Sequence, residues 1–261
     1  MLTTIASYRL INQDLDRSLS TTRSAPAVQR ESDYFLEKIE TVKSVDDFLA
    51  NDRLFNYAME AFGLEEMSYA KAFMRKVLEG GIDDRNSFAN GLADNRYREF
   101  VETFNFSRYG ETTTVFERAR SGTVERYVRQ AFEIEAGNQN QGVRLALYFQ
   151  RKAPEVSSAF GILADRALLE VAQVALGLPA NMSNLDIDRQ AKLITDRLDI
   201  EDLKDPEKLD KLIEGFTARW DMANPSRPLT VAVPNAILGA PGIVGVGADI
   251  LASLQNLKYG G

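Results

Sequence analysis

The sequence predicts an all-α protein made of many helices, with an internally duplicated helical unit and amphipathic helices at both ends. Two observations predict this fold. Apolar residues recur at steps of three and four along most of the chain, which is the period of one helix face. Glycine, proline, serine and aspartate stand where such segments begin and end. We therefore expect little β structure.

Composition limits the classes of function. The chain has 261 residues, 44% of them hydrophobic and 26% charged, which is the balance of a folded globular protein with one large or two modest domains. The formal net charge of −7 repels phosphate backbones and anionic lipid. We therefore expect no nucleic-acid partner.

The chain contains neither cysteine nor histidine. Disulfides, thiolate catalysis, a Ser/His/Asp triad and a typical zinc site are thus excluded. We expect no catalytic residue, no metal, no cofactor and no small-molecule substrate. An enzyme that uses carboxylates or a lysine is left as an alternative.

The N-terminal region, residues 1–43, predicts two helices. Residues 2–20 form an amphipathic pattern whose apolar side we assign to a subunit interface. The interface residues on this side are Ile5, Tyr8, Leu15 and Leu19. A stretch rich in serine and threonine around Pro26 interrupts the pattern, and a second helix is expected to run from Tyr34 to Val42.

The first repeat unit is predicted at residues 44–108. Ser44 and Asp47 match an N-terminal capping signature, and Gly63 follows an apolar helical face at a position typical of a helix C-cap. About four helices are expected before residue 108. Asp83 and Asp84 begin what resembles a calcium loop, but the required glycine and final glutamate are missing, so a turn between helices explains them better.

The connecting helices are predicted at residues 109–157. One long helix is expected around Gly122, followed by a polar turn at 137–142 (GNQNQG) and another helix from Val143. The turn has the glycine spacing of a phosphate-binding loop but lacks its lysine and its preceding strand. A small basic cluster, Arg144, Arg151 and Lys152, is expected to pair with acids such as Glu133 or Glu155.

The second repeat unit is predicted at residues 158–222, because the apolar pattern of the first unit returns 114 residues later. The paired positions include Leu54 with Leu168, Ala58 with Ala172, Ala61 with Ala175, Gly63 with Gly177 and Leu64 with Leu178. The alternative is that two unrelated amphipathic helices align in this way. Asp205 and Pro206 have the pattern of an N-cap followed by proline, which predicts the start of the unit's last helix.

The C-terminal part divides into a Pro/Gly-rich linker, residues 223–248, and an amphipathic helix, residues 249–261. The linker carries three prolines and four glycines between Pro228 and Ala248, so we expect no membrane-spanning segment there. The helix places Ile250, Leu251, Leu254 and Leu257 on one side, and we assign these four residues to the interface as well. The helix is expected to dock on the core, on the N-terminal helix or on another subunit.

Three stretches resemble a family. They are YRLINQDLDRSL, the run from Ser44 to Phe106, and GVRLALYFQRKAPEVSSAFGILADRALLEVAQVALGLP. They look like an alphaproteobacterial domain of unknown function whose members tend to lie in flagellar gene clusters. The segment DILASLQNLK is also similar to the last helix of flagellar hook and rod proteins, although residues 2–20 lack the asparagine-rich motif of the hook-protein N-terminus.

The resemblance implies a non-enzymatic flagellar structural or assembly protein that acts through helix-mediated subunit contacts. Its partners would be flagellar proteins or further copies of itself. The N-terminus has no secretory signal pattern, so the expected location is the flagellum or basal body without general secretion. The alternative is a cytoplasmic adaptor, export chaperone or regulator of flagellar assembly.

Overall fold

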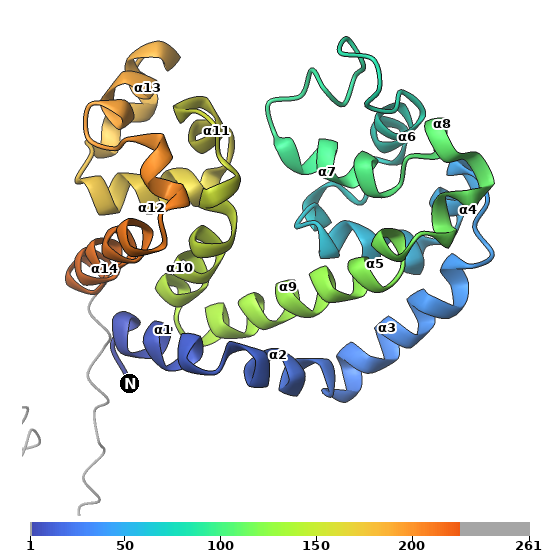
Figure 1. Ribbon diagram of the computed structural model, residues 1–261, viewed down its shortest axis with the longest axis horizontal. Helices are drawn as coiled ribbons and strands as arrows, with labels where there is room; N and C mark the ends of the chain where they lie inside the picture. Colours follow the sequence, from blue (N-terminus) through green and yellow to red (C-terminus); the bar gives the residue numbers. More distant parts are fainter. Residues whose placement is uncertain (1, 225–261) are drawn as a thin grey trace, which may run out of the picture. The chain divides into compact units, whose positions relative to one another are not determined.

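The computed structural model describes residues 2–224, and this part of the chain contains helices and no β-strand (Figure 1). The predicted all-α fold is confirmed. Within these residues, no helix combines the length and the apolar character that crossing a bilayer requires. Most of the predicted linker and the predicted interface residues Ile250, Leu251, Leu254 and Leu257 lie outside the described residues.

Three helices form the N-terminal region: α1 (Thr4–Gln13), α2 (Leu15–Arg23) and α3 (Pro26–Ile39). The single helix predicted for residues 2–20 is two helices, because the Asp14 backbone leaves the helical region and its carboxylate caps α2 by accepting from the Arg17 N–H. Pro26 occupies the first turn of α3, where its missing N–H costs nothing.

The first helical group contains α4 (Val45–Ala50), α5 (Asp52–Ala61), α6 (Lys71–Glu79), α7 (Asn95–Thr103) and α8 (Phe106–Tyr109). Local chemistry sets its boundaries as predicted at two points. Ser44 accepts a hydrogen bond from the Asp47 N–H and begins α4. Gly63 adopts φ +67° after α5, a left-handed conformation that favours glycine.

The core of this group is aromatic. Phe48, Phe55, Phe100 and Phe104 are fully buried and their rings contact one another. Phe35 of α3 belongs to the same apolar cluster. The core therefore extends beyond the predicted unit 44–108, since the apolar face of α3 has to be covered and this group covers it.

Two consecutive helices, α9 (Ser121–Gln139) and α10 (Gln141–Lys152), connect the first group to the second. The polar turn predicted at 137–142 is much shorter, because α9 continues through Gly137 and only Asn140 leaves the helical region. The Asn140 side chain caps α10 by accepting from the Gly142 N–H. A Cβ at Gly137 would lie 2.7 Å from Arg144 Cδ, so glycine permits the close approach of α9 and α10.

The second helical group contains α11 (Ala159–Ala164), α12 (Arg166–Leu176), α13 (Ile187–Thr195) and α14 (Pro206–Ala223). Asp205 caps α14 and Pro206 occupies its first turn, as predicted. The group's core draws on α9 and α10 as well, through residues such as Phe132 and Phe149, so it also exceeds its predicted unit. Residues 2–224 also contain short 3-10 helices: η1 (Glu65–Met67), η2 (Gly110–Val115), η3 (Glu117–Ala119), η4 (Ala153–Glu155), η5 (Ala180–Asn184) and η6 (Ile200–Lys204).

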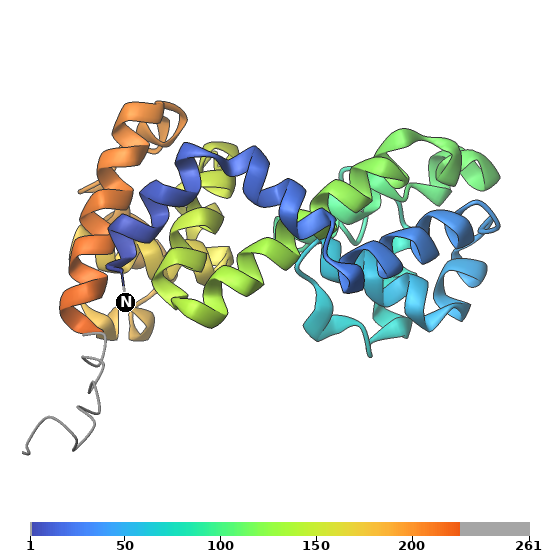
Figure 2. The same cartoon turned by 90° about the horizontal axis from the view of Figure 1, so that it is seen from below.

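The N-terminal helices pack along α9, α10 and α14, and Figure 2 shows α1 and α2 lying across the other helices. Tyr8 is buried in the core of the second group, and Ile5, Leu15 and Leu19 are partly buried against it. These four residues were predicted to form a subunit interface. Much of their apolar side packs against the protein's own core, because α1 contacts α10 and α14 and α2 contacts α9. A subunit interface at the part of Ile5, Leu15 and Leu19 that stays exposed is still a prediction.

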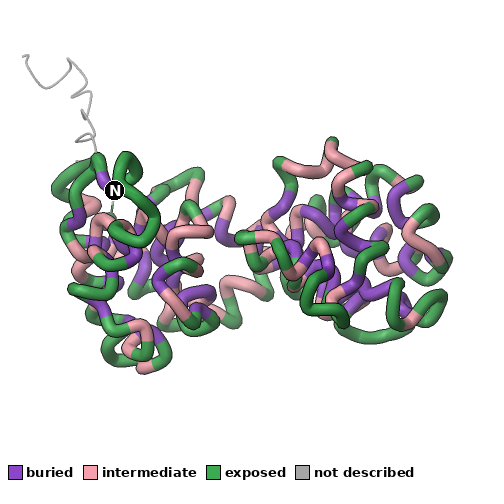
Figure 3. The backbone as a smooth tube through the Cα atoms, turned by 90° about the horizontal axis from the view of Figure 1, so that it is seen from above, coloured by how far each residue is buried: buried purple, intermediate pink, exposed green. Residues whose placement is uncertain are grey.

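Buried positions line the inside of both helical groups, as the burial colouring in Figure 3 shows. The groups share an order of elements: a six-residue helix, an Asx N-cap, a helix of ten or eleven residues and a left-handed glycine. The internal duplication itself stays a prediction.

Candidate functional site

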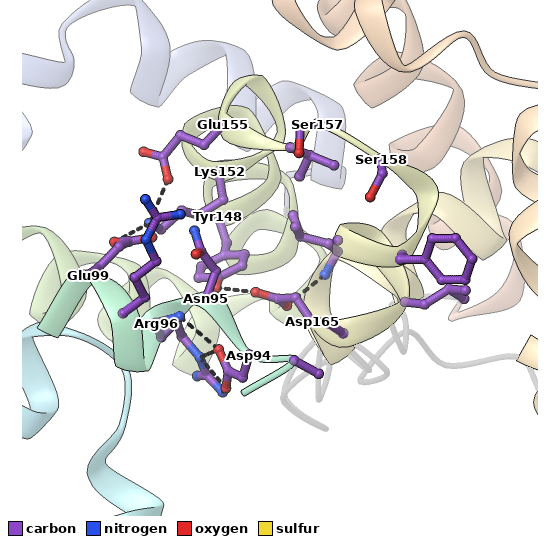
Figure 4. Close-up of a pocket in the computed structure, with 18 of the residues that line it drawn as sticks. Asp94, Asn95, Arg96, Glu99, Tyr148, Lys152, Glu155, Ser157, Ser158 and Asp165 are labelled. Carbon is purple, nitrogen blue, oxygen red and sulfur yellow. Dashed lines mark hydrogen bonds and ion pairs between the residues drawn. The ribbon is translucent and has the colours of Figure 1, made fainter. Parts of the chain in front are cut away.

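A cleft of about 640 Å³ lies between α7 and the α10–α12 segment. Figure 4 shows its polar side chains, which come from both helical groups. One wall is formed by Asp94, the N-cap of α7, with Arg96 and Glu99 of α7, and a second wall by Tyr148 and Lys152 from the last turns of α10. The third wall is formed by α11 and by the start of α12.

Tyr148 and Asp165 form the polar floor of the cleft. The Tyr148 hydroxyl donates a hydrogen bond of 2.5 Å to one oxygen of the Asp165 carboxylate. The other oxygen accepts from the backbone N–H groups of Ala167 and Leu168, which is the N-cap of α12. Burial and the neighbouring Asp165 charge raise the pKa of Tyr148, so the phenol stays protonated and acts as a donor at neutral pH.

Lys152 joins the two sides of the cleft. Its Nζ lies 2.8 Å from both carboxylate oxygens of Glu99 and 2.8 Å from Glu155. The Lys152 side chain is 10% exposed, and Glu99 is also largely buried. An ion pair removed from solvent in this way is screened weakly and depends strongly on both partners. Glu99 also contacts Arg126 of α9.

Arg96 connects the cleft wall at α7 to the turn at Gly63. Its guanidinium binds the Asp94 carboxylate, with a shortest distance of 2.7 Å, and donates to the Gly63 carbonyl oxygen. Asp94 is also the N-cap of α7, through the Arg96 backbone N–H. The left-handed Gly63 turn, the α7 cap and the cleft wall are therefore fixed together.

The rim of the cleft is apolar and exposed. Phe160 of α11 is 48% exposed, and Ile187 at the start of α13 is 56% exposed, and both line the cleft. Leu185, two residues before Ile187, is 40% exposed. Large apolar side chains that border a polar groove are typical of a surface that another protein covers.

The chemistry available in the cleft is that of carboxylates, lysine, arginine, tyrosine, one asparagine and two serines. The charged side chains whose contacts are described above bond one another or cap helices. Among the described residues, no group of three or more acidic side chains is placed to hold a metal ion. The arrangement orients helices and offers a charged wall with an apolar rim.

Sequence reasoning missed this cleft, because its residues come from helices separated by up to about 90 positions. A neighbouring feature was predicted in part, because two of the three basic residues of the cluster pair with acids as expected: Lys152, which lines the cleft, with Glu155, and Arg151, which does not line it, with Glu133. The four N-terminal interface residues do not line the cleft. One residue of the cleft could have been found from the sequence: Asp165 follows a short apolar run and precedes a helical pattern, which is typical of a helix N-cap.

Comparison with known proteins shows to which family the chain belongs. Residues 61–209 match the family described as "Protein of unknown function (DUF1217)". A crystal structure of protein AGR_C_984 from Agrobacterium tumefaciens is 49% identical in sequence, with a TM-score of 0.79 over 86% of this chain and 98% of that chain. Among curated proteins, none matches. The chain belongs to the DUF1217 family.

Proposed function

We propose that this member of the DUF1217 family is a non-enzymatic flagellar structural or assembly protein that acts through helix-mediated protein contacts. The observation that carries the protein-contact part is the exposed apolar rim of the cleft, formed by Phe160 and Ile187 with Leu185 beside them. The flagellar part rests on the sequence resemblance to proteins encoded in flagellar gene clusters.

The rim suits a helix of a partner. Phe160 lies on α11 and Ile187 lies on α13, and these two helices contact each other, so their exposed side chains belong to one region of the surface. Helix-in-groove recognition uses a few apolar anchors flanked by charges. Phe160 and Ile187 supply anchors, and the charged wall with Lys152 and Glu155 supplies the flank.

The bonding inside the cleft supports a structural role for its ionisable groups. A general base has to be free to accept a proton, but Asp165 accepts from Tyr148 and from two backbone N–H groups. A nucleophilic lysine needs a free amine, but the Lys152 Nζ donates hydrogen bonds to Glu99 and to Glu155, each at 2.8 Å.

The test combines localisation with a rim variant. In the bacterium that carries the gene, Phe160→Ser with Ile187→Ser is expected to reduce motility and the amount of the protein that copurifies with hook-basal bodies. Tyr69→Ser is the matched control, since Tyr69 is 83% exposed and does not line the cleft. Hook-basal bodies that lack the protein, together with normal motility of the double variant, would refute the proposal.

A cytoplasmic adaptor, export chaperone or regulator of flagellar assembly is the second candidate. The observation that favours it is the burial of Tyr8 in the protein's own core, because this leaves α1 less apolar surface for pairing with neighbouring subunits, although Leu10 of α1 is 59% exposed. This candidate predicts a soluble pool, one preferred client and no fraction associated with filaments. Fractionation of flagellated cells distinguishes the two.

A further inference from the structure

Arg98 of α7 lines the cleft and is exposed to solvent. Within residues 2–224, no hydrogen bond, ion pair or cation–π contact involves its guanidinium group. The acids one turn away on α7 are Asp94 and Glu102. The Asp94 carboxylate binds Arg96, and Glu102 does not line the cleft. Arg98 therefore adds a positive charge that its own helix does not balance.

The other charged side chains of the cleft balance one another. Three carboxylates and three cations form ion pairs there, one of the cations being Arg126 of α9. The pairs are Asp94 with Arg96, Glu99 with Arg126, and Lys152 with both Glu99 and Glu155. The remaining acid, Asp165, caps α12 and accepts three hydrogen bonds, so the helix N-terminus stabilises its charge. Among the described residues that line the cleft, Arg98 alone is left with an unbalanced charge.

Arg98 and the apolar rim belong to different walls of the cleft. Arg98 lies on α7, whereas Phe160 lies on α11 and Ile187 on α13. Figure 4 shows the α7 wall on one side and the segment that leads into α11 on the other. An occupant that contacts both walls needs an acidic side chain on one side and apolar side chains on another, which an amphipathic helix provides.

Covering the cleft changes the surroundings of Arg98. In the free protein, water hydrates the exposed guanidinium group. An apolar occupant would remove this water without replacing its hydrogen bonds, which is unfavourable. A carboxylate replaces them with a charge-assisted and often bidentate contact, and a lysine or arginine at the same place is repelled. Arg98 thus discriminates between apolar helices that present an acid and those that do not.

We propose that the partner segment recognised by the cleft is an amphipathic helix that presents an aspartate or glutamate to Arg98 beside apolar side chains that cover Phe160 and Ile187. The inference rests on the proposed function, because it names the chemistry of the partner at the same cleft. Phe160 and Ile187 supply affinity for apolar helices in general, and Arg98 determines which of them bind.

The test is a selection from random peptides of about 16 residues, which allows about four helical turns. The peptides are displayed on phage and bound to the purified full chain. Peptides that are enriched on the wild-type chain but not on the chain with Phe160→Ser and Ile187→Ser use the cleft rim. These peptides are expected to be rich in aspartate or glutamate with apolar residues one turn away. On Arg98→Gln, the preference for acids is expected to disappear.

Arg23→Gln is the matched control, because Arg23 of α2 is also an exposed arginine and does not line the cleft. It is expected to select the same acidic peptides as the wild-type chain. The most enriched peptide, labelled with fluorescein, is expected to bind Arg98→Gln at least about fivefold more weakly in fluorescence anisotropy. Replacing its acid by the amide has the same effect, and both changes together weaken binding no further.

Thermal unfolding of Arg98→Gln is expected to match the wild-type chain, so weaker binding does not result from misfolding. The inference is overturned if the rim-dependent peptides show no excess of acids, or if Arg98→Gln and Arg23→Gln select the same peptides. It is also overturned if those peptides are basic, which would indicate docking on Glu155. These outcomes leave the rim as a docking site. If no peptide depended on the rim, the inference would fail as well, whereas hook-basal bodies and motility decide the proposed function.

Discussion

Glu133 of α9 accepts two hydrogen bonds from Arg151 of α10, at 2.9 Å and 2.8 Å, and its side chain is only 1% exposed. Arg129, one turn before Glu133, donates a third bond of 2.9 Å to the same carboxylate. The helix α9 contributes Tyr127 to the core of the first group and Phe132 to that of the second. This ion cluster therefore fixes α10 against the helix that both cores share.

We expect Glu133→Gln to destabilise the protein by roughly 2–4 kcal/mol, because two partly buried guanidinium groups lose their counter-charge. The measurement is the free energy of unfolding from urea denaturation. Asp196→Asn is the control, since it breaks the exposed pair with Lys192 and is expected to cost less than about 0.5 kcal/mol. Equal effects of the two variants would show that burial of Glu133 does not matter.

Gly142 holds the contact of α1, α10 and α14. A Cβ at this position would lie 2.4 Å from Trp220 Cδ1 and 2.9 Å from Thr4 Cγ2. We expect Gly142→Ala to displace the indole and to cost about 1–3 kcal/mol, the range for overpacked sites. Trp220 is the single tryptophan of the chain, so its fluorescence spectrum reports the displacement.

The control for this variant is Gly215→Ala on α14, the helix that carries Trp220. Its Cβ meets only the flexible end of Arg219, 3.3 Å away, and alanine favours helix, so stability is expected to stay equal or rise by up to about 1 kcal/mol. A Gly142→Ala protein with unchanged fluorescence and unchanged unfolding would contradict the packing argument.

Gly177 ends α12 in the left-handed region with φ +60°, and no atom lies within 4 Å of a Cβ added there. The cost of Gly177→Ala is therefore backbone strain alone, about 1–2 kcal/mol. Gly177→Asn is expected to cost less, because asparagine tolerates this conformation. Thermal unfolding ranks the two variants, and an alanine variant as stable as the asparagine one would exclude strain as the cause.

Glu60 makes stability depend on pH. Burial, and then the charges of Glu65 and Glu31, raise the pKa of Glu60 above its usual value. The folded state thus carries an unfavourable charge at neutral pH, and this cost disappears as the pH falls below the folded and then the unfolded pKa. We expect Glu60→Gln to raise the urea midpoint at pH 7 and to have no such effect near pH 4.

Glu31 provides a control of opposite sign. A hydrogen bond from Arg53 lowers the pKa of Glu31, so its contribution is present at neutral pH and is lost as the pH falls through the folded pKa. Glu31→Gln is expected to lower the midpoint at pH 7. If both variants shifted the midpoint in the same direction, the opposite charge environments of the two carboxylates would not explain their effects.

Much of the secondary structure is readable from the sequence, because helix ends depend on neighbouring residues. Ser44, Pro26, Gly63 and the Asp205-Pro206 pair act within one turn, and each stands at the boundary that its chemistry predicts. Asn140 shows the limit. The glycines on either side of Asn140 suggested a long polar turn, but Gly137 lies inside α9. A glycine is favoured there because a Cβ would lie too close to the Arg144 side chain.

The sequence by itself thus determined the all-α class, several helix ends such as those at Ser44, Gly63 and Asp205, and the pairing of Arg151 and Lys152 with nearby acids, since these follow from contacts within about 20 residues. Only the tertiary structure decided the rest. Apolar periodicity says which side of a helix is buried but not what covers it. For that reason Tyr8 was assigned to another subunit while it lies in the core with Phe216, and Glu99 was not connected with Lys152 across the cleft.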